Sequence, residues 1–248
     1  MQRIYSIWCS FWFLIVFLFL FPFFFLFLQN KKWHTYAHYL NRLWAQIYFP
    51  LCGLKLDGNY KFLPDASKAY VFCANHSSFL DIAAMGLVLK NFYAFVGKKS
   101  ISKIPLFGYM FTKLHIAVDR ESNRSAHETM KISLEMLKNG RSIVIFPEGG
   151  IKTKNPPFMS HKLKDGAIRM AIITQVPIVP ISFPDNWLIL PDDGKLLFKK
   201  HKLRYTVHEP IQTIGLTLND VEFLTEKVKN TITQELIKYY PEKYTENN

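Results

Sequence analysis

The apolar residues divide the chain into an uncharged N-terminal segment and a longer region where short apolar runs alternate with polar stretches. Residues 4–30 contain no charged side chain and hold nine of the 22 phenylalanines. This segment is longer than the roughly 20 residues that a helix needs to cross a bilayer core. We therefore expect residues 4–30 to anchor the protein in a membrane.

The anchor is expected to be uncleaved. A signal peptide has a shorter apolar core, of about 7–15 residues, followed by a small-residue cleavage site, whereas Gln29, Asn30 and Lys31 follow the apolar run here. Pro22 interrupts the segment, so a kinked span and a re-entrant hairpin both fit. More basic residues follow the segment than precede it, which favours a cytoplasmic location for the region that follows.

Residues 33–54 mix aromatic and basic side chains. Such a helix suits the headgroup layer of a membrane that contains anionic lipid. The alternative is a core helix whose aromatic rings face the folded domain. We expect the interfacial helix, and so assign residues 1–54 to an anchoring helix or helical hairpin. His34 and His38 are four residues apart but lack a third metal ligand nearby, so we expect surface histidines there.

Residues 55–248 are expected to form one domain. Candidate strands are residues 70–74, 93–96, 116–118, 142–146, 179–183 and 203–207, and candidate helices are residues 79–89, 106–113, 126–137, 166–173 and 221–239. Alternation of short apolar runs with helical periodicity is typical of a sheet covered by helices. The pattern predicts an α/β fold: a mostly parallel central β-sheet flanked by helices.

Charge and cysteine content narrow the function classes. The chain carries 31 Lys and Arg against 19 Asp and Glu, and Arg3 is the one charged residue among the first 30 positions. Three cysteines cannot form a disulfide framework, and their spacing matches no zinc or redox motif. A basic run at 195–204 suits anionic lipid or an acidic carrier protein. We expect no nucleic acid partner, because the aromatic anchor points to a membrane.

Two polar motifs follow predicted strands, where ligands collect in such sheets. Residues 75–81 read NHSSFLD, and residues 146–149 read FPEG. His76 and Asp81 are five residues apart, so a turn and the start of a helix capped by Ser77 or Ser78 would bring the carboxylate to the imidazole. That is the geometry of a general base with its orienting acid.

These motifs resemble the glycerolipid acyltransferase family that includes 1-acylglycerol-3-phosphate acyltransferase (PlsC-type). NHSSFLD resembles the family's NHxxxxD block, and three further blocks follow in the family's order. They are residues 98–120, with IPLFG at 104–108 and VDR at 118–120; FPEG at 146–149; and VPIVP at 176–180. Residues 164–167, KDGA, resemble a lysine-containing stretch that follows the third block.

The resemblance implies transfer of a fatty acyl group from acyl-CoA or acyl carrier protein to the free hydroxyl of lysophosphatidic acid, which gives phosphatidic acid. His76, held by Asp81, would take the hydroxyl proton, and backbone N–H groups near the first or third motif would stabilise the oxyanion. No Gly-x-Ser-x-Gly nucleophile elbow is present, which removes the usual serine hydrolase. We expect no metal ion and no cofactor.

The acceptor phosphate requires cations, and Arg120 is the first candidate because a guanidinium fork matches phosphate oxygens. Lys98, Lys152 and Lys164 are further candidates. The third block also places Glu148 and Gly149 in the substrate site. For Glu148 a role in the acceptor site and a structural role fit equally well.

One departure from the family concerns the third block, which usually continues with Thr-Arg after the glycine. Here the chain reads GIKTK at 150–154, so the arginine is absent. Lys152 would replace it as a point charge, or the acceptor differs, for example an amino-acid-linked lyso-lipid. A non-catalytic lipid-binding membrane protein of the same fold is the third alternative. We expect a membrane location, a bacterial inner membrane, with the catalytic domain on the cytoplasmic face.

Overall fold

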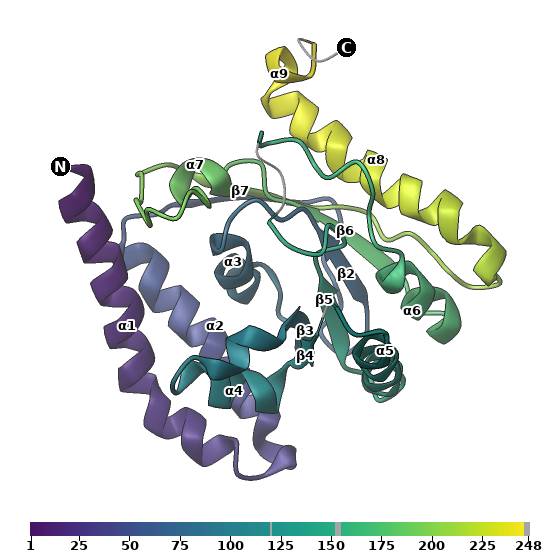
Figure 1. Cartoon of the computed structure of the whole chain (residues 1–248), viewed down its shortest axis with the longest axis horizontal. Helices are drawn as coiled ribbons and strands as arrows, with labels where there is room; N and C mark the ends of the chain where they lie inside the picture. The colour runs from purple at the N-terminus through teal and green to yellow at the C-terminus, as the bar shows by residue number, and fades with distance from the viewer. Residues whose placement is uncertain (120, 152–154, 246–248) are drawn as a thin grey trace.

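A central β-sheet organises the molecule (Figure 1). The computed structural model describes residues 1–119, 121–151 and 155–245, without the side chain of Thr245. Within these residues the sheet has seven strands in the order β1-β7-β6-β2-β5-β3-β4. The strands are β1 (Leu56–Tyr60), β2 (Val71–Ala74), β3 (Tyr93–Lys98), β4 (Ile116–Val118), β5 (Ser142–Ile145), β6 (Ile178–Ser182) and β7 (Leu203–Val207).

The sheet is mostly parallel, which confirms the predicted α/β class. Strands β2 to β6 run parallel to their neighbours among themselves, whereas β7 pairs antiparallel with β6 and carries β1 at the edge. The carboxyl ends of the five parallel strands therefore meet at one edge of the sheet.

Helices cover both faces of the sheet (Figure 1). One face carries α1 (Gln2–Phe27), α2 (His34–Leu51), α3 (Leu80–Val88) and α4 (Phe107–Leu114), and the other carries α5 (Asn123–Lys138), α6 (Gly166–Thr174) and α8 (Val221–Tyr239). Two short helices complete the described part of the chain: α7 (Asn186–Ile189), whose Ile189 joins the first core cluster, and α9 (Pro241–Thr245), whose Tyr244 packs against the second. Strand β2 serves both faces, because Phe72 packs with the first layer and Val71 with the second.

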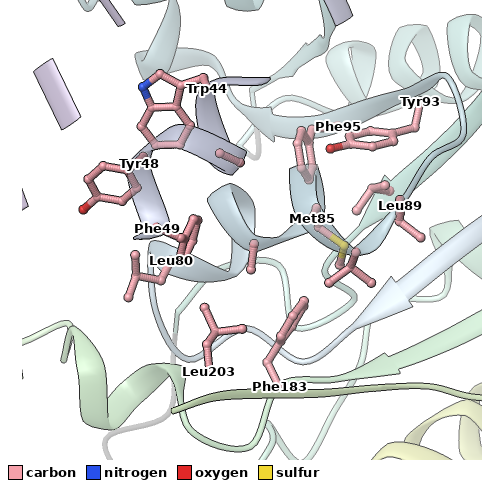
Figure 2. Packing of buried hydrophobic residues seen from close by; sticks show 14 of the residues in the cluster. Trp44, Tyr48, Phe49, Leu80, Met85, Leu89, Tyr93, Phe95, Phe183 and Leu203 are labelled. Atoms are coloured by element: carbon pink, nitrogen blue, oxygen red, sulfur yellow. The ribbon is translucent and has the colours of Figure 1, made fainter. Parts of the chain in front are cut away.

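Helix α2 contributes to the core along its second half. Figure 2 shows Trp44, Tyr48 and Phe49 together with Leu80 of α3 in one buried cluster. The first half differs, since Tyr36 and Tyr39 are exposed. The core interpretation therefore holds for the second half of this helix, while the first half is divided: Ala37 and Leu40 join the core, and the rings of Tyr36 and Tyr39 face outward.

The expected surface histidines of α2 are buried, which corrects the sequence-based expectation. His34 and His38 are only 9% and 8% exposed, and Nε2 of His38 lies 3.0 Å from the carbonyl oxygen of Asn91. Burial lowers the pKa of His38 to about 4. The apolar neighbours of the helix, which lie far away in the sequence, determine this burial.

Helix α1 is continuous and packs antiparallel to α2. The Tyr5 hydroxyl donates to the carbonyl of Cys52, and Phe27 packs on Tyr36 at the opposite end of the pair. Pro22 lies inside the helix, so the chain does not turn back there. Among the described residues, α1 is the one helix long and apolar enough to cross a membrane by length and composition.

Candidate active site

The two polar motifs meet at the carboxyl edge of the parallel strands. Strand β2 leads into Asn75 and His76, and β5 leads into Phe146, Pro147 and Glu148. Because β2 and β5 are paired neighbours, with Cys73 beside Ile145, the residues that follow them emerge side by side. The sheet register thus brings together residues that lie about seventy positions apart in the sequence.

The structure brings His76 and Asp81 into direct contact. Nδ1 of His76 lies 2.9 Å from Oδ2 of Asp81, and the carboxylate is fully buried. A carboxylate can only accept, so Nδ1 carries the imidazole proton and Nε2 holds the free lone pair. Within the described residues Nε2 has no hydrogen-bond partner.

Further donors fix the Asp81 carboxylate. Oδ2 accepts from the backbone N–H groups of Ser77 and Ser78, at 2.8 and 2.9 Å, and Oδ1 accepts from Nδ2 of Asn186 at 2.7 Å. Helix α3 starts after Phe79, which makes no side-chain cap, although Oγ of Ser78 accepts from the backbone of Leu80 at 3.2 Å. Asp81 in the first turn thus takes over part of the role expected of a serine cap.

An aromatic ring supports the imidazole. The rings of His76 and Phe146 stack, with centroids 4.1 Å apart and an interplanar angle of 19°. His76 is 7% exposed and Phe146 is 9% exposed. The stacked ring and the Asp81 hydrogen bond together define the direction in which Nε2 points.

Glu148 is buried and joins two backbone segments. Oε1 accepts from the N–H of His76 at 2.7 Å, and Oε2 accepts from the N–H of Ser160 at 2.9 Å. Burial raises the pKa of Glu148, and the two backbone hydrogen bonds oppose that rise. Of the two interpretations left open by the sequence, this geometry favours the structural one.

The remaining candidate residues fall into three groups. Gly149, with φ of 73°, lies against Lys164, because an added Cβ would sit 2.8 Å from the Lys164 side chain. Lys98 is exposed at the end of β3, and no described hydrogen bond or ion pair joins it to His76 or Asp81. Arg120 and Lys152 lie outside the described residues.

Backbone N–H groups of the first motif are already engaged. Those of Ser77 and Ser78 donate to Asp81, and that of His76 donates to Glu148. In this arrangement the three groups do not serve a reaction oxyanion.

Sequence reasoning missed the segment 183–190, which packs on the first motif. The side-chain amide of Asn75 makes a reciprocal pair of hydrogen bonds with the backbone of Phe183, at 2.8 and 2.9 Å, and Oγ of Ser78 donates to the carbonyl of Leu190 at 2.7 Å. The polar residues after Phe183 give no local sign of these distant partners.

Comparison with known proteins agrees with the motifs. Residues 58–184 match a family model described as Acyltransferase. The chain is 29% identical over 209 residues to a chloroplastic 1-acyl-sn-glycerol-3-phosphate acyltransferase of Brassica napus, covering 84% of this chain and 57% of the relative. It is 32% identical over 184 residues to one of Arabidopsis thaliana, covering 73% of this chain and 49% of the relative. The chain thus spans about half the length of these two relatives.

The fold has a counterpart among solved structures. The crystal structure of the 1-acyl-sn-glycerophosphate acyltransferase PlsC from Thermotoga maritima superimposes with a TM-score of 0.73 over 94% of this chain and 97% of that one. The two sequences are 20% identical, so this likeness shows a shared fold.

Proposed function

The chain belongs to the acyltransferase family, and on that premise we propose that it transfers a fatty acyl group from acyl-CoA or acyl carrier protein to the free hydroxyl of lysophosphatidic acid. The single observation that carries this proposal is the His76–Asp81 pair, with Nδ1 of His76 2.9 Å from Oδ2 of Asp81 and Nε2 left without a described partner. The names of the two plant relatives support the choice of acceptor.

The mechanism is general base catalysis. Nε2 of His76 removes the proton from the acceptor hydroxyl while that oxygen attacks the thioester carbonyl, and Asp81 stabilises the imidazolium that forms. Collapse of the tetrahedral intermediate forms the ester C–O bond and breaks the C–S bond. The imidazolium then returns its proton to the departing thiolate, so that neither the protein nor a cofactor is consumed.

Acceptor recognition is assigned to cations and to the third motif. Arg120, Lys152, Lys98 and Lys164 are the candidates for the phosphate. Lys164 lies against Gly149, and Glu148 holds the backbone of His76, so Glu148 acts on the site through the turn that carries the base. Arg120 would bind the phosphate with its bidentate guanidinium fork, whereas the lysines would bind it as point charges.

Membrane attachment is assigned to the N-terminal pair of helices. Helix α1 carries no charged side chain after Arg3, and α2 exposes Tyr36 and Tyr39 near its N-terminal end, which follows α1. We propose that residues 1–54 hold the protein at a bacterial inner membrane and that residues 55–248 form the acyltransferase domain on its cytoplasmic face. A lipid acceptor would then reach the base from the bilayer.

A different acceptor is the second candidate. The arginine that usually follows the third block is absent, and Ile151 and Lys152 stand at that region instead. Loss of a bidentate phosphate ligand favours an acceptor with another headgroup, such as an amino-acid-linked lyso-lipid. The His76–Asp81 chemistry is the same for either acceptor.

Product analysis by mass spectrometry tests the proposal. The detergent-solubilised protein is incubated with acyl-CoA and acyl carrier protein thioesters and a panel of lyso-lipids, alongside the His76→Ala variant. We expect phosphatidic acid from the unaltered protein and none from the variant.

Two other results would change the assignment. Acylation of a lyso-lipid without a phosphomonoester headgroup, and of no other, would keep the mechanism and replace the acceptor. No product with any acceptor, together with retained lipid binding, would identify a non-catalytic lipid-binding protein.

A further inference from the structure

We propose that Asn186, at the start of α7, is the positioning residue that orients Asp81 toward His76. This inference rests on the proposed function, because it assigns a part in setting up the base. Asn186 lies 105 residues after Asp81 in the chain, and both side chains are fully buried.

The direction of the hydrogen bond follows from the chemistry of the two groups. Oδ1 of Asp81 lies 2.7 Å from Nδ2 of Asn186, and a carboxylate offers no proton, so the amide nitrogen must face it. The amide oxygen of Asn186 is buried and has no hydrogen-bond partner within the described residues. The donation to Asp81 is therefore the polar interaction that this side chain contributes there.

This hydrogen bond gives the two oxygens of the Asp81 carboxylate different partners. With Oδ1 held by Asn186, Oδ2 faces Nδ1 of His76 and the backbone N–H groups of Ser77 and Ser78. A rotation of the carboxylate would break all of these contacts together. Asn186 thus fixes the carboxylate plane in which the imidazole is held.

The start of α7, which carries Asn186, is anchored through the neighbouring Asp185. The buried Asp185 carboxylate forms an ion pair with Arg204 of β7, whose Nη2 donates to Oδ1 at 2.8 Å, and it also accepts from the Tyr240 hydroxyl at the end of α8. Arg204 in turn stacks over Tyr239 at 4.3 Å. Strand β7 and the end of α8 therefore support the start of α7 through Asp185.

Two substitutions separate positioning from packing. Asn186→Leu keeps the approximate size of the side chain and removes the donor. Asn186→Asp keeps the shape and places a second carboxylate beside Asp81. The matched controls are Asn230→Leu and Asn230→Asp on the exposed surface of α8. The ionisable groups near position 186 are Asp81 and His76 on one side and Asp185, Arg204 and Tyr240 on the other.

We expect Asn186→Leu to lower kcat by about 10- to 100-fold, the range of a hydrogen bond to a charged group, with KM for both substrates nearly unchanged. Asn186→Asp is expected to lose activity at neutral pH and to regain it as pH rises. Added negative charge favours the imidazolium, whereas the base must be neutral to accept a proton. The acid limb of the kcat/KM profile then moves to higher pH.

A structural role would give a different result: both variants would lose the same factor at every pH, or change KM and kcat together. Either result, or activity equal to that of the Asn230 controls, would overturn the positioning role.

An activity-independent measurement separates this inference from the proposed function. In NMR, the Nδ1–H proton of His76, which Asp81 holds, should exchange faster with water in Asn186→Leu than in the unaltered protein. If the unaltered protein transfers no acyl group, the proposed function fails. Equal exchange of this proton in the two proteins would refute the inference on its own.

Discussion

At the scale of single residues, Glu148 connects two parts of the backbone that the sequence does not place together. Its carboxylate holds the N–H of His76, 72 residues away, and the N–H of Ser160. The side chain is 2% exposed, so water does not compete for these hydrogen bonds. Glu148 is therefore expected to matter for stability as well as for the placement of His76.

We predict that Glu148→Ala lowers the free energy of unfolding by about 1–3 kcal/mol for each of the two N–H groups that lose their acceptor. Glu148→Gln should also destabilise the protein, because the NH2 of its amide would lie against one of the two backbone N–H groups and cannot accept a hydrogen bond from it. Denaturant unfolding measures both effects. The control is Glu226→Ala, a side chain that is 57% exposed on α8. Unfolding of Glu148→Ala at the same midpoint as the control would contradict this account.

The candidate site was partly predictable at this scale because some of it is local. His76 and Asp81 are five residues apart, and a turn followed by a helix start places them together. Asn186 lies 105 residues from Asp81 and meets it only through the order of strands in the sheet. No sequence pattern around Asn186 shows that contact, whereas the spacing of His76 and Asp81 does.

At the scale of elements, most strands were predictable, whereas the edge strand β1 was not. Strands β4 and β7 have the predicted bounds, because β4 is a short apolar run and Leu203, Tyr205 and Val207 of β7 alternate with polar residues. Strand β1 reads LDGNY and is exposed along its length, so it lacks the apolar alternation of a strand. Its pairing depends on Gly58, where a Cβ would lie 2.1 Å from the Tyr205 ring. Tertiary contact, rather than local preference, forms this strand.

Charged substitutions in helix α1 test whether this helix attaches the protein to a membrane. Phe19 and Phe23 are 72% and 48% exposed, so their replacement by glutamate should leave the fold intact. A charge at the centre of a membrane helix costs about 2.5–3.5 kcal/mol, so the double variant should leave the membrane fraction in alkaline extraction. Phe223→Glu on α8, where Phe223 is 65% exposed, is the matched control and should stay bound. Membrane retention of the double variant would contradict the assignment of α1 as the anchor.

At the scale of the whole molecule, buried polar groups tie the last helix to the sheet. His208, after β7, shares a hydrogen bond with Ser182 at 2.8 Å, and Lys61 lies between His208 and Glu235 of α8. Burial, with a smaller effect of Lys61, lowers the pKa of His208 to about 4. Protonation of His208 therefore opposes folding.

This produces a pH dependence of stability. The unfolded chain takes up a proton at His208 near pH 6.5, while the folded chain does so only near pH 4, so stability is lost as pH falls between these values. We predict that His208 accounts for at most about 2 kcal/mol of the stability lost between pH 7 and pH 5. Denaturant unfolding of His208→Gln at both pH values should therefore show a smaller loss of stability than that of the unaltered protein. An exposed control, His127→Gln, should behave as the unaltered protein does, and equal losses in all three would contradict the prediction.

The central sheet flanked by helices followed from the sequence, while the division of the α2 side chains between the core and the surface did not. The sequence alone does not distinguish the aromatic residues of α2 from one another, yet Tyr48 is fully buried and Tyr39 is 64% exposed. Which ring is covered depends on where α1 and α3 pack. That packing is decided by the whole fold and has no local sequence pattern.

The most direct test of the central claim compares kcat/KM for acyl transfer to lysophosphatidic acid between His76→Ala and His127→Ala. His127 lies exposed on α5, on the opposite face of the sheet from α3. If His76 is the general base, its loss lowers the rate by about 100-fold or more, while His127→Ala retains full activity and both variants remain folded. Equal activity of the two folded variants would contradict the assignment of His76 as the base.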